Sequence, residues 1–128
     1  MKKKDIKILV VDDEQDILEI VGYNLSQEGF KIVTASNGKE AIAVAKKERP
    51  QLIIMDVMMP EMDGMEACEN IRKIPELSNT IITFLTARSE DYSQVAGFDV
   101  GADDYIAKPI KPKLLVSKVK ALLRRLKD

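Results

Sequence analysis

Two stretches, Ile8-Leu9-Val10-Val11-Asp12-Asp13 and Leu52-Ile53-Ile54-Met55-Asp56, decide the fold of this chain. Each apolar run is short and rich in β-branched residues, which is typical of a strand buried on both faces of a parallel sheet. Acidic residues that follow two such strands meet at one edge of the sheet. Like charges raise one another's pKa unless a cation lies between them, and Mg²⁺ needs few protein carboxylates because it keeps several waters. The two stretches therefore predict a small Mg²⁺ site at Asp12, Asp13 and Asp56, with one carboxylate left to react.

Apolar runs alternate with amphipathic segments along the rest of the chain. The runs predict strands at 7–11, 31–35, 52–55, 80–85 and 105–107, and the amphipathic segments predict helices at 14–27, 39–47, 65–74, 91–100 and 113–126. Such a β/α alternation without a linker predicts an α/β fold, namely a doubly wound, five-stranded parallel sheet in three layers, α/β/α. In the flavodoxin-like strand order 2-1-3-4-5, ligands bind where the order reverses, between the first and third strands.

Length and composition fit one soluble globular domain. The chain has 128 residues, of which 45% are hydrophobic and 32% charged. Cys68 is the single cysteine, so an internal disulfide is excluded and a cytoplasmic location is expected. No apolar run is long enough for an export signal or a membrane span, so no membrane partner is expected. The absence of histidine excludes histidine-based catalysis and a role as a phosphohistidine donor.

Two more polar side chains are expected at the same edge of the sheet. Thr86 follows the predicted fourth strand, and Lys108 follows the fifth, directly before Pro109. Because the strands are parallel, a hydroxyl and an ammonium would then lie beside the three carboxylates.

In this order the residues resemble the receiver domains of bacterial two-component response regulators, and the match covers essentially the whole chain. Asp12-Asp13 resembles the acidic pair of that family, and the segment from Asp56 to Gly64 resembles its phosphoacceptor strand and following loop. Thr86-Ala87, Tyr105 and Lys108-Pro109 resemble its switch hydroxyl, switch aromatic residue and lysine-proline step. Together, at these spacings, the motifs are highly specific.

The resemblance implies a role for each residue. Asp56 would be the nucleophile that accepts a phosphoryl group from a histidine kinase, with Asp13 binding Mg²⁺ directly and Asp12 binding it directly or through water. The backbone carbonyl of Met58 would be a further metal ligand. Lys108 would hold one phosphoryl oxygen and Thr86 would donate a hydrogen bond to another, while Thr86 and Tyr105 would form the switch. The family also implies a cis bond before Pro109, and no enzymatic activity beyond the domain's own phosphorylation and dephosphorylation.

The last helix narrows the resemblance to receivers of the winged-helix transcription-factor branch. Residues 118–125 and 101–105 resemble that branch, whose receivers pair through the face of the fourth helix, fifth strand and fifth helix. Gln94 and Leu114 replace a basic residue and a glutamate that are usual there, which predicts a weaker homodimer or one that depends less strictly on phosphorylation. The expected apolar patch is Val95, Phe98 and Val116, and the expected ion-pairing residues are Asp103, Asp104, Lys118, Lys120 and Arg125. Residues 1–128 would form the receiver alone, with any output domain beyond residue 128.

Several of these residues also have a plainer interpretation. Asp12-Asp13-Glu14 could simply cap a helix, and Lys108 could form a surface ion pair. Met58 could be core or loop filler, and Tyr105 a half-buried strand residue. No such structural interpretation explains Asp56, because a carboxylate directly after four apolar residues is costly to desolvate without a partner.

Three other protein classes compete with the receiver interpretation. A flavin-binding electron-transfer protein needs a phosphate loop rich in Gly, Ser or Thr after the first strand, where this chain has Asp12-Asp13-Glu14. An aspartate-nucleophile phosphatase normally has a second acid two residues after the nucleophile, where this chain has Met58. The basic last helix could bind nucleic acid, but its stripe of Leu115, Val119, Leu122 and Leu126 is needed for packing, so we expect a solvated basic face and no nucleic-acid binding. Within the receiver family, the alternative to transcriptional control is a single-domain receiver that acts by docking.

Overall fold

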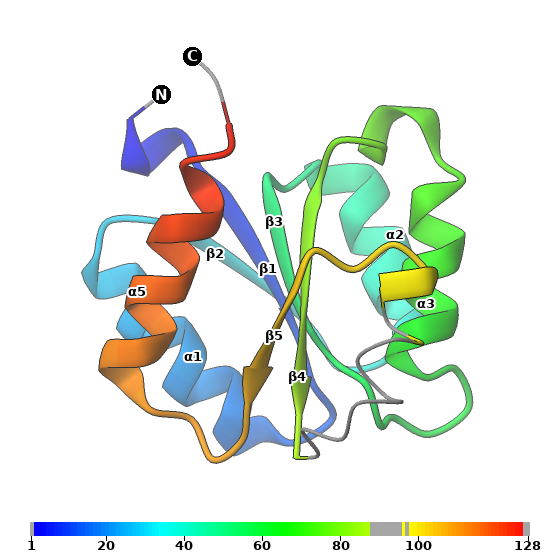
Figure 1. Ribbon diagram of the computed structural model, residues 1–128, viewed down its shortest axis with the longest axis horizontal. Coiled ribbons are helices and arrows are strands. Elements are labelled where there is room, and N and C mark those ends of the chain that lie inside the picture. Colours follow the sequence, from blue (N-terminus) through cyan, green and yellow to red (C-terminus); the bar gives the residue numbers. More distant parts are fainter. Residues whose placement is uncertain (1, 88–95, 97, 127–128) are drawn as a thin grey trace.

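A five-stranded parallel sheet forms the centre of the computed structural model, which describes residues 2–87, 96 and 98–126 (Figure 1). The strand order is β2-β1-β3-β4-β5, and each of the four pairings is parallel. The predicted doubly wound α/β fold and its strand order are therefore confirmed. The strands are β1 (Lys7–Val11), β2 (Lys31–Ala35), β3 (Leu52–Asp56), β4 (Ile81–Thr86) and β5 (Asp104–Ala107).

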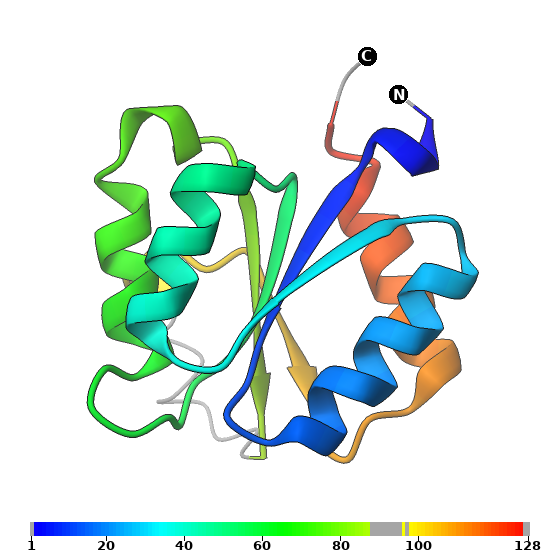
Figure 2. The same cartoon turned by 180° about the vertical axis from the view of Figure 1, so that it is seen from behind.

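Helices cover both faces of the sheet, with α1 and α5 on one face and α2 and α3 on the other (Figures 1 and 2). Their bounds are α1 (Gln15–Gln27), α2 (Gly38–Glu48), α3 (Gly64–Arg72) and α5 (Pro112–Leu123), with short 3₁₀ helices η1 (Lys3–Asp5) and η2 (Pro75–Leu77). Most of the helix predicted at 91–100 lies outside the described residues. In the part of the chain that the structure describes, no helix is both long and apolar enough to cross a membrane.

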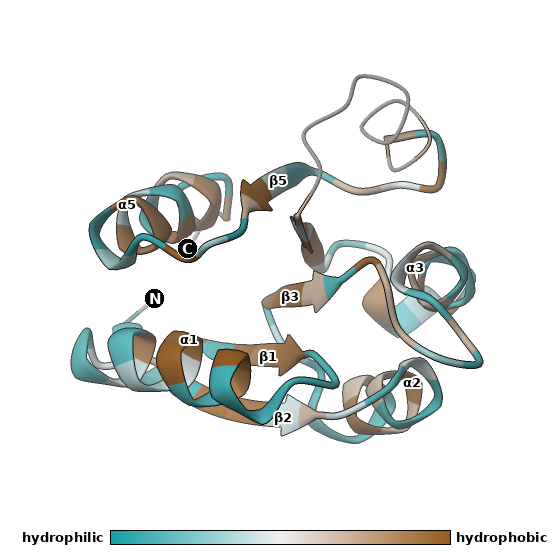
Figure 3. Ribbon diagram, turned by 90° about the horizontal axis from the view of Figure 1, so that it is seen from below, coloured by the Kyte–Doolittle hydropathy of each residue, from teal (hydrophilic) through white to brown (hydrophobic). Residues whose placement is uncertain are grey.

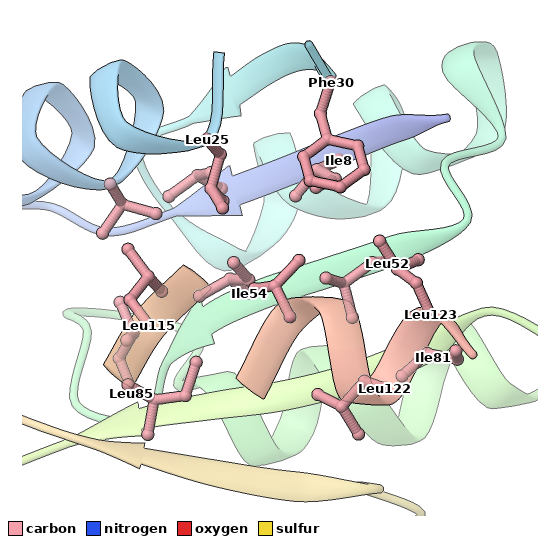
Figure 4. Close-up of a cluster of buried hydrophobic side chains, with 14 of the residues drawn as sticks. Ile8, Leu25, Phe30, Leu52, Ile54, Ile81, Leu85, Leu115, Leu122 and Leu123 are labelled. Carbon is pink, nitrogen blue, oxygen red and sulfur yellow. The ribbon is translucent and has the colours of Figure 1, made fainter. Parts of the chain in front are cut away.

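The strand side chains alternate between two cores, as the period of two in a strand requires. Ile8 and Ile54 point into the core beneath α1 and α5, whereas Leu9 and Ile53 point into the core beneath α2 and α3. Figure 4 shows the first core, where Leu25 of α1 and Leu115 of α5 meet the strand residues. Strands β1, β3 and β4 are buried along almost their whole length, so the sheet holds the residues at its carboxyl edge on rigid supports.

The helix predicted at 113–126 is shorter in the structure. It begins at Pro112, whose missing N–H costs nothing at the first helical position, and it ends at Leu123. The predicted apolar stripe is nevertheless confirmed, since Leu115, Val119 and Leu122 are buried and Leu126 packs against the same core.

Candidate functional site

Three carboxylates converge at the carboxyl edge of the sheet, the edge that Figure 3 views. Asp12 directly follows β1, Asp56 ends β3, and the neighbouring pair Val11–Met55 brings the two strand ends side by side. Asp12 and Asp56 are 0% and 4% exposed, whereas Asp13 is exposed. Carboxylate oxygens of all three residues lie within 4.8 Å of one another. The predicted convergence of the acids is therefore confirmed.

Lys108 places its ammonium among these acids. Its Nζ lies 3.1 Å from Asp12 Oδ2, 3.4 Å from Glu14 Oε1 and 3.5 Å from Asp56 Oδ1. The backbone N–H of Lys108 donates to the carbonyl of Thr86 (2.8 Å), which ties the loop after β5 to the end of β4. The Lys108–Pro109 bond is cis, as expected. The contact with Glu14 was missed from the sequence, although Glu14 continues the acidic run Asp12-Asp13.

Burial and like charge make the acids unusually basic. Burial, followed by repulsion from Asp12, raises the pKa of Asp56 to about 6, although Lys108 and the N–H of Met58 act in the opposite direction. Burial is also the main cause of the raised pKa of Asp12. Burial alone would lower the pKa of Lys108, but the close contact with Asp12 and the attraction of Asp56 and Glu14 outweigh it, so this pKa is raised. The single ammonium of Lys108 thus neutralises only part of the negative charge of the two buried carboxylates.

The donor set fits a hard divalent cation. Asp12 Oδ1 accepts a hydrogen bond from the N–H of Glu14 (2.8 Å), the residue before α1, but no side chain makes a capping hydrogen bond at the start of α1. Asp12 Oδ2 is buried and, although it lies 3.1 Å from Lys108 Nζ, it accepts no well-oriented hydrogen bond from the described residues. A buried carboxylate oxygen without a hydrogen bond is unfavourable. Mg²⁺ or a similar oxygen-preferring cation, bound beside Asp13 and Asp56, would supply the missing partner of Asp12 Oδ2.

Thr86 and Met58 flank the carboxylates. Thr86 is the last residue of β4 and is buried, one position beyond the register pair Asp56–Leu85. Met58 lies in the loop after β3, where its side chain is 76% exposed and its N–H donates to Asp56 Oδ1 (3.3 Å). Met58 is therefore a loop residue and does not fill the core.

Tyr105 lies inside the domain. It is 7% exposed and makes edge-to-face contacts with Phe84 and Phe98, with ring centroids 5.8 and 5.2 Å apart. Phe98 is itself 48% exposed, so Tyr105 connects the core to an exposed aromatic side chain.

The residues predicted for the dimer face divide between two sides of α5. Lys118 donates to the carbonyl of Tyr105 (2.6 Å) and Arg125 lies 3.6 Å from Asp103, so both face β5. Lys120 instead pairs with Glu28, next to α1, at 2.7 Å, and Val116 packs against the core beneath α1 and α5. Lys120 and Val116 thus lie on the side of α5 that faces α1, and their part in a dimer face stays a prediction. Asp104 is half-buried at the start of β5, whereas Val95 and Gln94 lie outside the described residues.

Asp103 has an internal role that the sequence did not indicate. Its Oδ2 accepts hydrogen bonds from Arg72 and from the N–H of Ile82, both 2.9 Å long. The Arg72 guanidinium also donates to the carbonyls of Gly101 and Thr80, so it joins α3 to the segments before β4 and β5. Gly101 and Asp103 lie 29 and 31 residues from Arg72 along the chain, so no local pattern marks these contacts.

Comparison with known proteins agrees with this geometry. The family model for the response regulator receiver domain matches residues 8–120. The chain is 46% identical over 119 residues to the alkaline phosphatase synthesis transcriptional regulatory protein PhoP of Bacillus subtilis (strain 168), covering 93% of this chain and 49% of that protein. It is 44% identical over 125 residues to the probable transcriptional regulator ycf27 of Pyropia yezoensis, covering 98% and 50%. The chain thus spans about half the length of the curated relatives it matches.

Among solved structures, the chemotaxis protein CheY4 of Vibrio cholerae is similar in both fold and sequence. The TM-score is 0.89 at 35% identity, and the match covers 92% of this chain and 98% of that one.

Proposed function

Because this chain belongs to the response regulator receiver domain family, we propose that Asp56 accepts a phosphoryl group from the phosphohistidine of a histidine kinase. The observation that carries the proposal is the convergence of Asp12, Asp13 and Asp56 at the carboxyl edge of the sheet, where the ammonium of Lys108 lies beside Asp12 and Asp56. Phosphoryl transfer needs positioning and neutralisation of negative charge more than it needs covalent assistance, and this arrangement supplies both.

In the proposed step, a carboxylate oxygen of Asp56 attacks phosphorus while the phosphorus–nitrogen bond of the donor breaks. The electron pair of that bond returns to the imidazole nitrogen, which takes up a proton, and the product on this chain is an acyl phosphate. A pKa of about 6 keeps Asp56 ionised at neutral pH, yet leaves it more basic than an exposed aspartate. Lys108 neutralises one phosphoryl oxygen and Thr86 donates a hydrogen bond to another.

Mg²⁺ would be held by Asp13 and Asp56, with Asp12 and the carbonyl of Met58 assisting, and would neutralise charge on the phosphoryl oxygens. Met58 offers no acid to protonate a leaving group. We propose no activity for the domain beyond its own phosphorylation and dephosphorylation.

The output is proposed to be control of transcription, since the relatives are named as transcriptional regulators. Phosphorylation can bias two pre-existing states only through contacts that differ between them, and Thr86 with Tyr105 would supply those contacts. The proposed pairing surface is the one that the sequence predicts, with Phe98 and Val116 in its apolar part. Its charged residues are Asp103, Asp104, Lys118, Lys120 and Arg125. Phe98 and Leu114 are both 48% exposed and contribute apolar area to it.

Labelling with a small phosphodonor tests the proposal. In acetyl phosphate and Mg²⁺, the intact mass should increase by one phosphoryl group, and alkali or hydroxylamine should remove that group, as expected of an acyl phosphate. Asp56→Asn should abolish labelling, whereas Asp16→Asn, an exposed acid at the start of α1, should label normally. Undiminished labelling of Asp56→Asn would exclude Asp56 as the acceptor.

A second variant tests whether Asp13 is a metal ligand. Asp13→Asn should raise the Mg²⁺ concentration for half-maximal labelling by about tenfold or more, because it removes one of the few charged ligands. An unchanged Mg²⁺ requirement would reject Asp13 as a ligand.

A further inference from the structure

We propose that Gly38, the first residue of α2, is a positioning residue for the phosphoacceptor site, because its missing side chain sets the course of the loop 57–63. The inference rests on the proposed function of Asp56. Gly38 belongs to the helical layer of α2 and α3 and is not one of the converging carboxylates or their cation. Its influence would reach Asp56 through the backbone of the loop.

The contact between Gly38 and Met62 leaves no space for a side chain. A Cβ atom on Gly38 would lie 2.7 Å from the carbonyl oxygen of Met62, 2.8 Å from its Cγ and 3.0 Å from its Cβ. Rotation of the Met62 side chain cannot relieve the first of these contacts, because it is made to backbone. Gly38 has a helical backbone conformation that alanine adopts readily, so the conflict is steric, and the three nearest atoms all belong to Met62.

The start of α2 is held more firmly than the loop. Asn37 Oδ1 accepts a hydrogen bond from the N–H of Glu40 (2.8 Å), and Glu40 Oε1 accepts one from Ser36 (3.3 Å), which together cap the helix. Ala41, in the first turn, is fully buried. In the loop, by contrast, Met58 is 76% exposed and Glu61 has a positive φ of 67°. We therefore expect the loop to move when a methyl group is added to Gly38.

The loop cannot absorb such a movement at its ends. The N–H of Val57 donates to Leu85 (3.2 Å), and the N–H of Gly64 donates back to Val57 (2.9 Å). A Cβ atom on Gly64 would overlap the carbonyl oxygen of Asp56, so the start of α3 also abuts the phosphoacceptor backbone. A displaced Met62 must therefore shift the residues between these two anchors. That segment includes Met58, whose N–H donates to Asp56 Oδ1.

The test compares Gly38→Ala with Gly22→Ala, a glycine-to-alanine change within α1. A Cβ atom on Gly22 would meet Ile32 Cγ2 at 3.6 Å, an ordinary contact, so this control should fold at least as well as the wild type and label at the same rate. Gly38→Ala should slow labelling by acetyl phosphate about tenfold or more, since small displacements of reacting groups are costly, and should raise the half-saturating Mg²⁺ concentration. Adding Met62→Ala, which removes the Cγ contact, should recover part of the rate.

A purely structural role would lower the unfolding midpoint without changing the Mg²⁺ requirement of the folded protein. Both quantities are therefore measured, and Gly38→Ala is repeated in the Gly22→Ala background to favour the folded state. A folded Gly38→Ala protein with wild-type rate and Mg²⁺ requirement overturns the inference. If Gly38→Ala does not fold even in the Gly22→Ala background, Gly38 is required for folding, and the inference is overturned as well. If the wild type itself does not label, the proposed function fails instead.

Discussion

Replacing Asp56 with asparagine should stabilise the folded domain at neutral pH, although it removes the proposed phosphoacceptor. Asp56 is 4% exposed, and burial, followed by repulsion from Asp12, raises its pKa from an ordinary 3.8 to about 6. Lys108 lies 3.5 Å away but compensates only partly. The folded wild type must therefore hold a charge at neutral pH that is less favourable there than in the unfolded chain. A neutral asparagine avoids this cost.

The raised pKa also gives the size and the pH dependence of the effect. Above about pH 6, Asp56 is ionised in both the folded and the unfolded states, and the full cost applies. As the pH falls from 6 toward 3.8, the folded protein takes up the proton before the unfolded chain does, so the cost disappears. At roughly 1.4 kcal/mol for each pKa unit, the difference amounts to about 3 kcal/mol. Asp56→Asn should exceed the wild type by up to this amount at pH 7.5, and the two should converge near pH 3.5.

Urea unfolding followed by circular dichroism, without Mg²⁺, measures this difference. Comparing the two proteins at each pH cancels the titration of groups elsewhere in the domain, and Asp16→Asn controls for loss of an exposed negative charge. Added Mg²⁺ should stabilise the wild type more than Asp56→Asn, because it binds the folded carboxylates. The reasoning is refuted if Asp56→Asn is no more stable than the wild type at pH 7.5, or if the difference is the same at both pH values.

Arg72→Met should lower the free energy of unfolding by about 2–3 kcal/mol, because it removes the side-chain donors to the carbonyls of Gly101 and Thr80 and one of the donors to Asp103. An unchanged urea midpoint would contradict this. Met58→Asn should leave the unfolding free energy within about 0.5 kcal/mol, since the side chain is exposed, but should speed loss of the phosphoryl group by opening a path for water. A time course of intact mass that shows an unaltered or slower loss would reject steric control. Beryllofluoride with Mg²⁺ should promote a dimer in sedimentation, and Phe98→Ala should weaken it; a monomer in both conditions at high concentration would favour a receiver that docks onto another protein.

The fold was largely predictable because local and long-range signals agree. Runs such as 52–55 are too short and too uniformly apolar for an amphipathic helix, and their alternation with helical segments leaves few topologies. The ends of the elements were less predictable. The apolar pattern predicts a last helix that continues to Leu126, whereas α5 ends at Leu123. No glycine or proline stands at this end of the helix to mark it in the sequence.

The site was predictable for a different reason. Asp12, Asp56, Thr86 and Lys108 each lie at or beside the carboxyl end of a strand, so the parallel topology alone brings them to one edge. Residues on α5 carry no such constraint. The stripe Leu115, Val119 and Leu122 fixes which side of the helix is buried, but not which neighbour each flank faces. For that reason Lys120, which pairs with Glu28, could not be separated from Lys118 by sequence alone.

Lys108 offers a physical route from the site to the surface of α5. Its Nζ contacts both Asp12 and Asp56, so a phosphoryl group on Asp56 would compete with Asp12 for the same ammonium. The backbone of Lys108 is bonded to Thr86, and the carbonyl of Tyr105, in the strand that leads to Lys108, accepts a hydrogen bond from Lys118. We therefore expect a change in the charge at Asp56 to bias β4, β5 and one flank of α5 together, because short contacts connect them. Lys120 pairs with Glu28 on the other flank of α5, so it should respond less to this change than Lys118 does.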